Sequence, residues 1–181
     1  VARLIALAKT TPIPPDKLER VFKEIEKDFT PQEASQLRLL ESRYGLVVPE
    51  NDRIDYWFPP HQKRELGRIL GRINFVSDET CRAFMLVAFS QILKSCSIWM
   101  QKSVKPVRDS NKTSADPVPA FMRQVKSMMK GNAEFHKLVG LEKTENLRQW
   151  RTVECQDARS LPIESNSAGL VVTSPPYVTS Y

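Results

Sequence analysis

The 181-residue chain has few of the residues that build metal sites, disulfide frameworks and membrane spans. It contains three cysteines, Cys81, Cys96 and Cys155, and two histidines, His61 and His136, which are far apart in the sequence. An odd number of widely spaced cysteines fits neither a zinc site nor a disulfide framework, and is typical of a reduced, cytoplasmic protein. No uncharged apolar run reaches the roughly 20 residues of a transmembrane helix, so we expect no membrane partner.

Glycine is also scarce, and its distribution excludes a Gly-rich nucleotide-binding loop within the chain. The six glycines are scattered at positions 45, 67, 71, 131, 140 and 169, without a Gly-x-Gly pair. The chain begins with Val1 rather than methionine, so we expect it to be cut or processed from something longer.

The composition is that of an ordinary globular protein with a modest basic excess. Hydrophobic residues make up 41% of the chain and charged residues 27%, with 27 basic and 21 acidic residues and a formal net charge of +6. This length corresponds to one domain, or to one and a fraction, and suffices for a sizeable core. The positive charge permits a polyanionic partner without requiring one.

Apolar residues recur at helical spacing over most of the chain. We expect helices over 1–9, 16–29, 30–45 with a capping box at 30–33, around 66–73, from 77–79 to about 100, and over 118–139. Residues 46–60 and 103–117 break this pattern and are expected to be irregular. The first of these segments holds the aromatic cluster Tyr56-Trp57-Phe58, which favours core anchoring over ligand binding.

The period changes near the end of the chain, where two short apolar runs predict strands. These runs are residues 151–155 and 170–173, and no hairpin turn lies between them. This arrangement suggests neighbouring strands of a parallel sheet. Two strands alone do not make a stable sheet, so the rest of the sheet must come from elsewhere.

The most specific motif is Ser-Pro-Pro-Tyr, which directly follows the second predicted strand. Its members are Ser174, Pro175, Pro176 and Tyr177. Average residue frequencies put a chance occurrence in a chain of this size at roughly one in a thousand. The alternative interpretation is a Pro-Pro linker near a terminus.

Residues 152–181 resemble DNA amino-methyltransferases, which use S-adenosylmethionine to methylate the exocyclic amine of cytosine or adenine. In that family, Asp-Ala or Asp-Ser at a strand end and then Leu-Pro precede the strand that carries Pro-Pro-Tyr. The same order occurs here as Asp157-Ala158, Leu161-Pro162 and residues 170–177. Residues 1–10 are similar to the segment after the second strand of that fold. The helical middle, with residues 56–58, the helix ending near Ser97 and residues 103–106, resembles an insert in one branch of the family.

The resemblance implies an α/β fold: a mostly helical chain with an incomplete Rossmann-like methyltransferase sheet at the C-terminal end. Residues 1–13 would belong to the methyltransferase core, 14–148 would form a helical insert that contacts DNA, and 149–181 would carry the catalytic motif. The Gly-rich cofactor loop would lie upstream of Val1 or on another chain, and further strands beyond Tyr181. We therefore expect residues 1–181 alone to bind the cofactor weakly and to be inactive.

The chemistry of such a reaction suits the motif. The lone pair of an aromatic exocyclic amine is delocalised into the ring, and acceptors aimed at its hydrogens localise it. By resemblance, the Ser174 hydroxyl and the Pro175 carbonyl are these acceptors, Pro175 and Pro176 stiffen the loop, and Tyr177 offers a flat face to an extruded base. No cysteine nucleophile is needed, so Cys155 is expected to be a buried strand residue. By the same resemblance, serine at the first motif position favours cytosine over adenine.

Two further groups of residues have both a functional and a structural interpretation. By resemblance, Asp157, with Ala158, accepts from the adenine amine of the cofactor; alternatively, this aspartate caps a turn. Gln156 stands where the family often has glycine. The basic loop with Lys102, Lys105, Arg108 and Lys112 either meets DNA phosphates or is simply solvated.

The leading hypothesis is therefore part of a site-specific DNA methyltransferase of a restriction–modification system, acting on the N4 amine of cytosine. An RNA base methyltransferase is the second enzymatic hypothesis, because related motifs serve that chemistry. The third hypothesis is a non-enzymatic helical interaction module.

Overall fold

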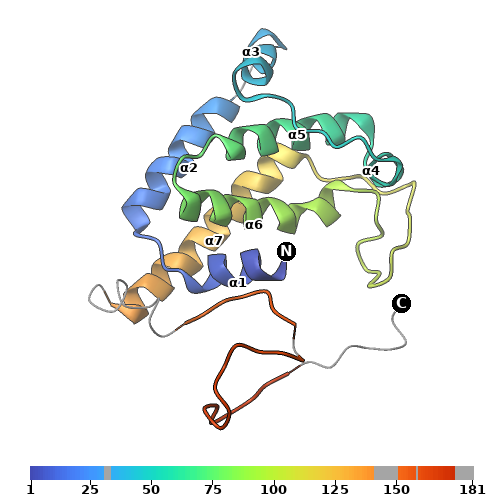
Figure 1. Cartoon of the computed structure of the whole chain (residues 1–181). Coiled ribbons are helices and arrows are strands. Elements are labelled where there is room, and N and C mark those ends of the chain that lie inside the picture. The colour runs from blue at the N-terminus through green and yellow to red at the C-terminus, as the bar shows by residue number, and fades with distance from the viewer. Residues whose placement is uncertain (31–33, 141–150, 158, 174–181) are drawn as a thin grey trace.

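The computed structural model describes residues 1–30, 34–140, 151–157 and 159–173, and this part of the chain is mainly helical (Figure 1). Its helices are α1 (Ala2–Thr10), α2 (Pro15–Phe29), α3 (Ala34–Tyr44), α4 (Asp52–Trp57), α5 (Pro60–Asn74), α6 (Glu79–Cys96) and α7 (Pro117–Val139). The helices predicted from periodicity are thus confirmed. In the described ranges, no helix combines the length and apolar character that crossing a membrane requires.

Helix α6 lies at the centre of the bundle. It packs against α1, α5 and α7, and Figure 1 shows it between α1 and α5 with α7 crossing behind. Its completely buried side chains include Cys81, Met85 and Ala88, which meet Phe121 and Val125 of α7 in one hydrophobic core. Burial of this apolar surface is the main favourable contribution to folding.

Asp78 caps the N-terminus of α6. The Asp78 carboxylate accepts a hydrogen bond from the Cys81 backbone N–H at 2.9 Å and pairs with the Lys17 ammonium at 2.5 Å. The hydrogen bond from Lys17 and the bond from the Cys81 N–H lower the pKa of Asp78 to about 2. The cap thus also joins α6 to α2.

Three sequence-based boundaries are wrong or incomplete. The helix predicted to reach residue 100 ends at Cys96, because the Ile98 N–H turns away to donate to the Trp57 carbonyl. Residues 46–60 are not wholly irregular, because the Asn51 side chain accepts from the Arg53 N–H and caps the short helix α4. The Thr30 hydroxyl donates to the Glu26 carbonyl at 2.8 Å, and residues 31–33 of the expected capping box lie outside the described residues.

A buried asparagine attaches the segment between α1 and α2 to the C-terminal half of the bundle. The Asn132 side chain accepts from the Ile13 N–H at 2.9 Å and donates to the Ile13 carbonyl at 2.7 Å. Both residues are buried, so this amide satisfies the two backbone groups of a segment that is not helical.

Two glycines of α5 allow the segment after α3 to cross this helix in close contact. The Val47 N–H donates to the Gly67 carbonyl at 3.2 Å. A Cβ atom added at Gly71 would lie only 2.2 Å from the Gly45 carbonyl oxygen, which is a backbone atom. Gly45 itself has φ +77°, the left-handed conformation that glycine commonly adopts just after a helix.

Gly71→Ala should therefore destabilise the protein by about 1–3 kcal/mol, because the backbone of the crossing segment has to move away. Gly131→Ala in α7 is the matched control, since a Cβ there meets nothing within 4 Å. Alanine at that helical position should stabilise by about 0.5–1 kcal/mol. Urea denaturation of both variants checks the prediction, and equal effects of the same sign would contradict it.

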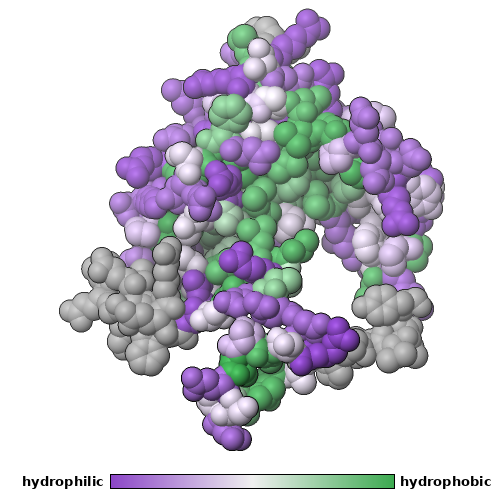
Figure 2. Space-filling view, viewed as in Figure 1, coloured by the Kyte–Doolittle hydropathy of each residue, from purple (hydrophilic) through white to green (hydrophobic). Residues whose placement is uncertain are grey.

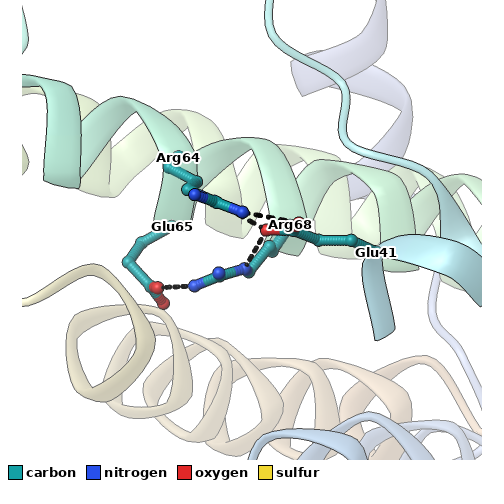
Figure 3. Close-up of polar contacts among 4 residues, drawn as sticks. All are labelled: Glu41, Arg64, Glu65 and Arg68. Carbon is teal, nitrogen blue, oxygen red and sulfur yellow. Dashed lines mark hydrogen bonds and ion pairs between the residues drawn. The ribbon is translucent and has the colours of Figure 1, made fainter. Parts of the chain in front are cut away.

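Ion pairs attach α3 to α5 (Figure 3). The Glu41 carboxylate accepts from Arg64 Nε and Nη2, both at 2.8 Å, and from Arg68 Nε at 2.7 Å. Arg68 also binds Glu65 of its own helix, and both of these side chains are largely buried. Hydrogen bonds from Arg64 and then Arg68 lower the pKa of Glu41 to about 2. Leu39 of α3 remains 68% exposed.

The C-terminal part runs beside α1 and forms no strand in the described ranges 151–157 and 159–173. Arg151 Nη1 donates to the hydroxyl groups of Thr10 and Thr11, at 2.5 and 2.8 Å, and Arg3 Nε donates to the Val153 carbonyl at 3.2 Å. The strands expected at 151–155 and 170–173 are absent here, because neither segment has a neighbouring strand to pair with. The proposed Rossmann-like sheet therefore stays a prediction.

Apolar side chains of this C-terminal part lie open to solvent. Leu170, Val171 and Val172 are 82%, 77% and 86% exposed, and Leu161 and Ile163 are also exposed. Figure 2 shows apolar side chains gathered at the lower end of the molecule, on the segment drawn red in Figure 1. Cys155 is exposed, so its prediction as a buried strand residue is wrong for the same reason: nothing in the described chain covers it.

Candidate functional site

The predicted catalytic motif lies outside the described residues. Ser174, Pro175, Pro176 and Tyr177 all follow Thr173, where the last described range ends, and Ala158 is also outside it. Their assigned roles stay predictions.

Asp157 occupies an exposed turn, and its carboxylate is held by a neighbouring arginine. Asp157 Oδ1 accepts from the backbone N–H and Nε of Arg159, both at 3.0 Å, and Oδ2 accepts from Arg159 Nη2 at 2.7 Å. These bonds lower the pKa of Asp157. The geometry is that of a turn-capping aspartate.

The described residues do not fit S-adenosylmethionine around Asp157. Both carboxylate oxygens are already engaged by Arg159, and the surrounding residues 154–157 and 159–163 are all exposed, so no apolar wall is available for an adenine ring. A ligand site of this kind normally encloses most of the ligand surface. A cofactor site would have to be completed by groups beyond the described residues.

Two of the three cysteines, Cys81 and Cys96, are buried, and Cys155 is exposed. Burial raises the pKa of Cys81 to about 12 and also raises that of Cys96, so neither thiol is activated. Nowhere in the described ranges do three or more His, Cys, Asp or Glu side chains gather as ligands of a metal ion.

The basic loop after α6 is a short antiparallel hairpin. The Met100 N–H donates to the Val107 carbonyl and the Asp109 N–H to the Ile98 carbonyl, each at 2.8 Å. We call residues 98–109 the basic hairpin, and residues 101–106 its tip. Sequence reasoning expected only a loop, because residues 101–106 contain no Asn-Gly, Asp-Gly or Gly pair typical of a hairpin turn.

Two lysines hold the basic hairpin against α6. Lys94 Nζ donates to the Ser103 carbonyl at 2.9 Å and lies 5.3 Å from the ring centroid of Trp99. Lys112 Nζ donates to the carbonyls of Lys94 and Trp99, both at 2.8 Å, and burial lowers its pKa. Of the four cations predicted to contact DNA, Lys112 is thus engaged within the protein.

Aromatic side chains support the other side of the basic hairpin. The Trp57 and Trp99 rings lie 5.6 Å apart, and Trp57 meets Tyr56 edge to face at 5.0 Å. The Arg108 guanidinium lies 4.7 Å from the Tyr56 ring centroid. The predicted core-anchor role of this cluster holds for Phe58, which packs on the core, whereas Tyr56 is 50% exposed and supports the hairpin.

The tip of the basic hairpin is positively charged and open to solvent. Within the tip, residues 101–106, the sequence has two basic residues and no acidic one. Lys102 and Lys105 are exposed and have no ion-pair partner among the described residues, and Val104 between them is 94% exposed. Lys102 and Lys105 thus lie exposed on the tip, whereas the Arg108 guanidinium lies over the Tyr56 ring, and DNA contact by these cations stays a prediction.

Comparison with known proteins gives one informative similarity. Over 186 aligned residues the chain is 28% identical to the type II methyltransferase M.MvaI of Kocuria varians, and the alignment covers 98% of this chain and 39% of that protein. The chain therefore spans about two fifths of the length of this relative. No protein-family model matches the chain, and no solved structure matches it.

Proposed function

We propose that this chain is part of a DNA methyltransferase that modifies the exocyclic N4 amine of cytosine. The alignment with a type II methyltransferase over 98% of the chain supports the methyltransferase part of the proposal. The choice of cytosine N4 rests on Ser174 at the first position of the motif. The Ser-Pro-Pro-Tyr motif at residues 174–177 supports it independently, since it resembles the base-handling motif of DNA amino-methyltransferases. The similarity to a type II methyltransferase is also consistent with our proposal of a cytoplasmic restriction–modification enzyme.

In this proposal, the chain supplies the groups that handle the target base. The Ser174 hydroxyl and the Pro175 carbonyl accept hydrogens of the exocyclic amine and localise its lone pair on nitrogen. Tyr177 stacks on the base after the base has left the duplex. Such catalysis rests on positioning and on preorganised acceptors, so no covalent enzyme intermediate is needed.

The methyl donor would be S-adenosylmethionine, held mostly by residues that this chain does not contain. The described residues around Asp157 offer no site for it, and no Gly-rich loop is present in the sequence. In the proposal, the exposed apolar residues 170–172 pack into a sheet whose other strands belong to the rest of the enzyme. That packing would bury a surface that is otherwise costly to expose.

Transfer of a radiolabelled methyl group by the full-length protein tests the proposal. We expect label to enter duplex DNA and not RNA of the same sequence. Incorporation into RNA alone would support the RNA methyltransferase hypothesis. Failure to label either nucleic acid would support the interaction-module hypothesis.

A further inference from the structure

The basic hairpin is held by hydrogen bonds within itself, by two lysine side chains and by the Trp57 ring. Trp99 Nε1 and the Ser103 hydroxyl both donate to the Lys105 carbonyl, at 3.1 and 2.8 Å, which fixes the path of the tip. Lys94 and Lys112 bind its backbone from the α6 side, and Trp57 packs on Trp99. An element ordered before binding loses little conformational entropy when a partner arrives.

None of these contacts involves the side chains of Lys102, Val104 and Lys105 in the tip. Lys102 and Lys105 project without an acidic neighbour, and Val104 lies between them at 94% exposure. The nearby Asp109 carboxylate accepts from the Asn111 N–H at 3.1 Å and so caps its own turn. The tip therefore presents two cations on either side of one apolar side chain.

A narrow hairpin closed by one antiparallel bridge, Trp99 to Arg108, and carrying this tip has a form and chemistry that suit the major groove of DNA. The major groove of B-form DNA admits a β-ribbon, whereas that of A-form RNA is too deep and narrow for side chains to read. Lysines suit the phosphates on the two edges of the groove, and an apolar side chain suits the thymine methyl groups on its floor.

We propose that the tip of the basic hairpin enters the major groove of duplex DNA, with Lys102 and Lys105 on phosphates and Val104 against base edges. This inference rests on the proposed function, because it takes duplex DNA as the substrate. It assigns Lys112 to holding the hairpin and not to DNA contact. It also adds Val104, which no charge-based argument would select.

The first test compares the duplex-DNA affinity of full-length variants over a range of salt concentrations. Lys102→Ala/Lys105→Ala should weaken binding about tenfold and reduce the slope of log affinity against log salt by about 2. The control Lys27→Ala/Lys130→Ala removes the same charge from exposed lysines of α2 and α7, and should leave the slope unchanged. Equal effects of the two double variants would overturn the proposal.

Val104→Ser separates the apolar contact from the charge. It should weaken DNA binding several-fold without changing the salt slope, whereas Leu138→Ser, at an 84% exposed leucine of α7, should have no effect. All substituted side chains are exposed, so each variant should have the same melting temperature as the wild type. A Val104→Ser variant that binds DNA as tightly as the wild type would contradict the base-edge contact.

Dimethyl sulfate probing of bound DNA identifies the groove, because guanine N7 lies in the major groove and adenine N3 in the minor groove. We expect the wild type to protect guanine N7 positions that the Lys102→Ala/Lys105→Ala variant leaves open. Protection confined to adenine N3, or equal binding and equal variant effects on duplex RNA, would overturn the inference.

Methyl transfer measured on the same samples distinguishes a failure of this inference from a failure of the proposed function. Tip-dependent binding without methyl transfer would overturn only the proposed function, and transfer with tip-independent binding only this inference.

Discussion

Ser174→Ala in the full-length protein should slow methyl transfer to DNA by about 100-fold or more, the effect typical of losing one preorganised polar group at a reacting centre. The hydroxyl is proposed to act on the amine as its lone pair localises, so its removal should lower the single-turnover rate far more than the affinity for DNA. Rapid-quench measurement with saturating DNA isolates this step.

Ser160→Ala is the matched control for this prediction. Ser160 is an exposed serine of the same C-terminal part, and its substitution should leave the single-turnover rate unchanged. If Ser174→Ala kept full activity, the assignment of the amine acceptor would be wrong. An equal loss in both variants would point instead to general sensitivity of this segment.

Arg68→Ala should destabilise the protein by about 3–5 kcal/mol, because it leaves a buried carboxylate without its partner. The Arg68 and Glu65 side chains are only 9% and 12% exposed, and they form an ion pair with each other (Figure 3). The same substitution removes one of the two arginines that bind Glu41. Guanidinium denaturation at neutral pH measures the effect.

Arg64→Ala provides the comparison, because Arg64 binds the same Glu41 carboxylate from an exposed position. Its side chain is 55% exposed, so its loss should cost at most about 1 kcal/mol. If the two variants had equal stability, the burial of the pair between Arg68 and Glu65 would carry no energetic weight.

The helices could be predicted from the sequence because their signals are local. Asp78 before an apolar stripe, Pro117 at the start of α7 and Gly45 at the end of α3 each mark a boundary through backbone chemistry. Helix α4 has only six residues, too few for an apolar period, and only the cap at Asn51 indicates it. The end of α6 was missed because the contact that redirects the chain there comes from Trp57.

The parts of the candidate site that could not be predicted depend on contacts between distant residues. The sequence indicates that residues 102–112 are basic, but only the structure shows Lys112 turned inward and Val104 outward. The apolar pattern of residues 151–155 and 170–173 favours strands, yet a strand requires a neighbour, and the described chain provides none. Cys155 is therefore exposed and not buried.

Identification of the methylated nucleoside tests the central claim most directly. Duplex DNA treated with the full-length protein and S-adenosylmethionine is digested to nucleosides and analysed by mass spectrometry against standards. Our account predicts N4-methyldeoxycytidine with the wild type and its loss with Ser174→Ala. Methylation at adenine N6 or cytosine C5, or no methylated nucleoside, would contradict it.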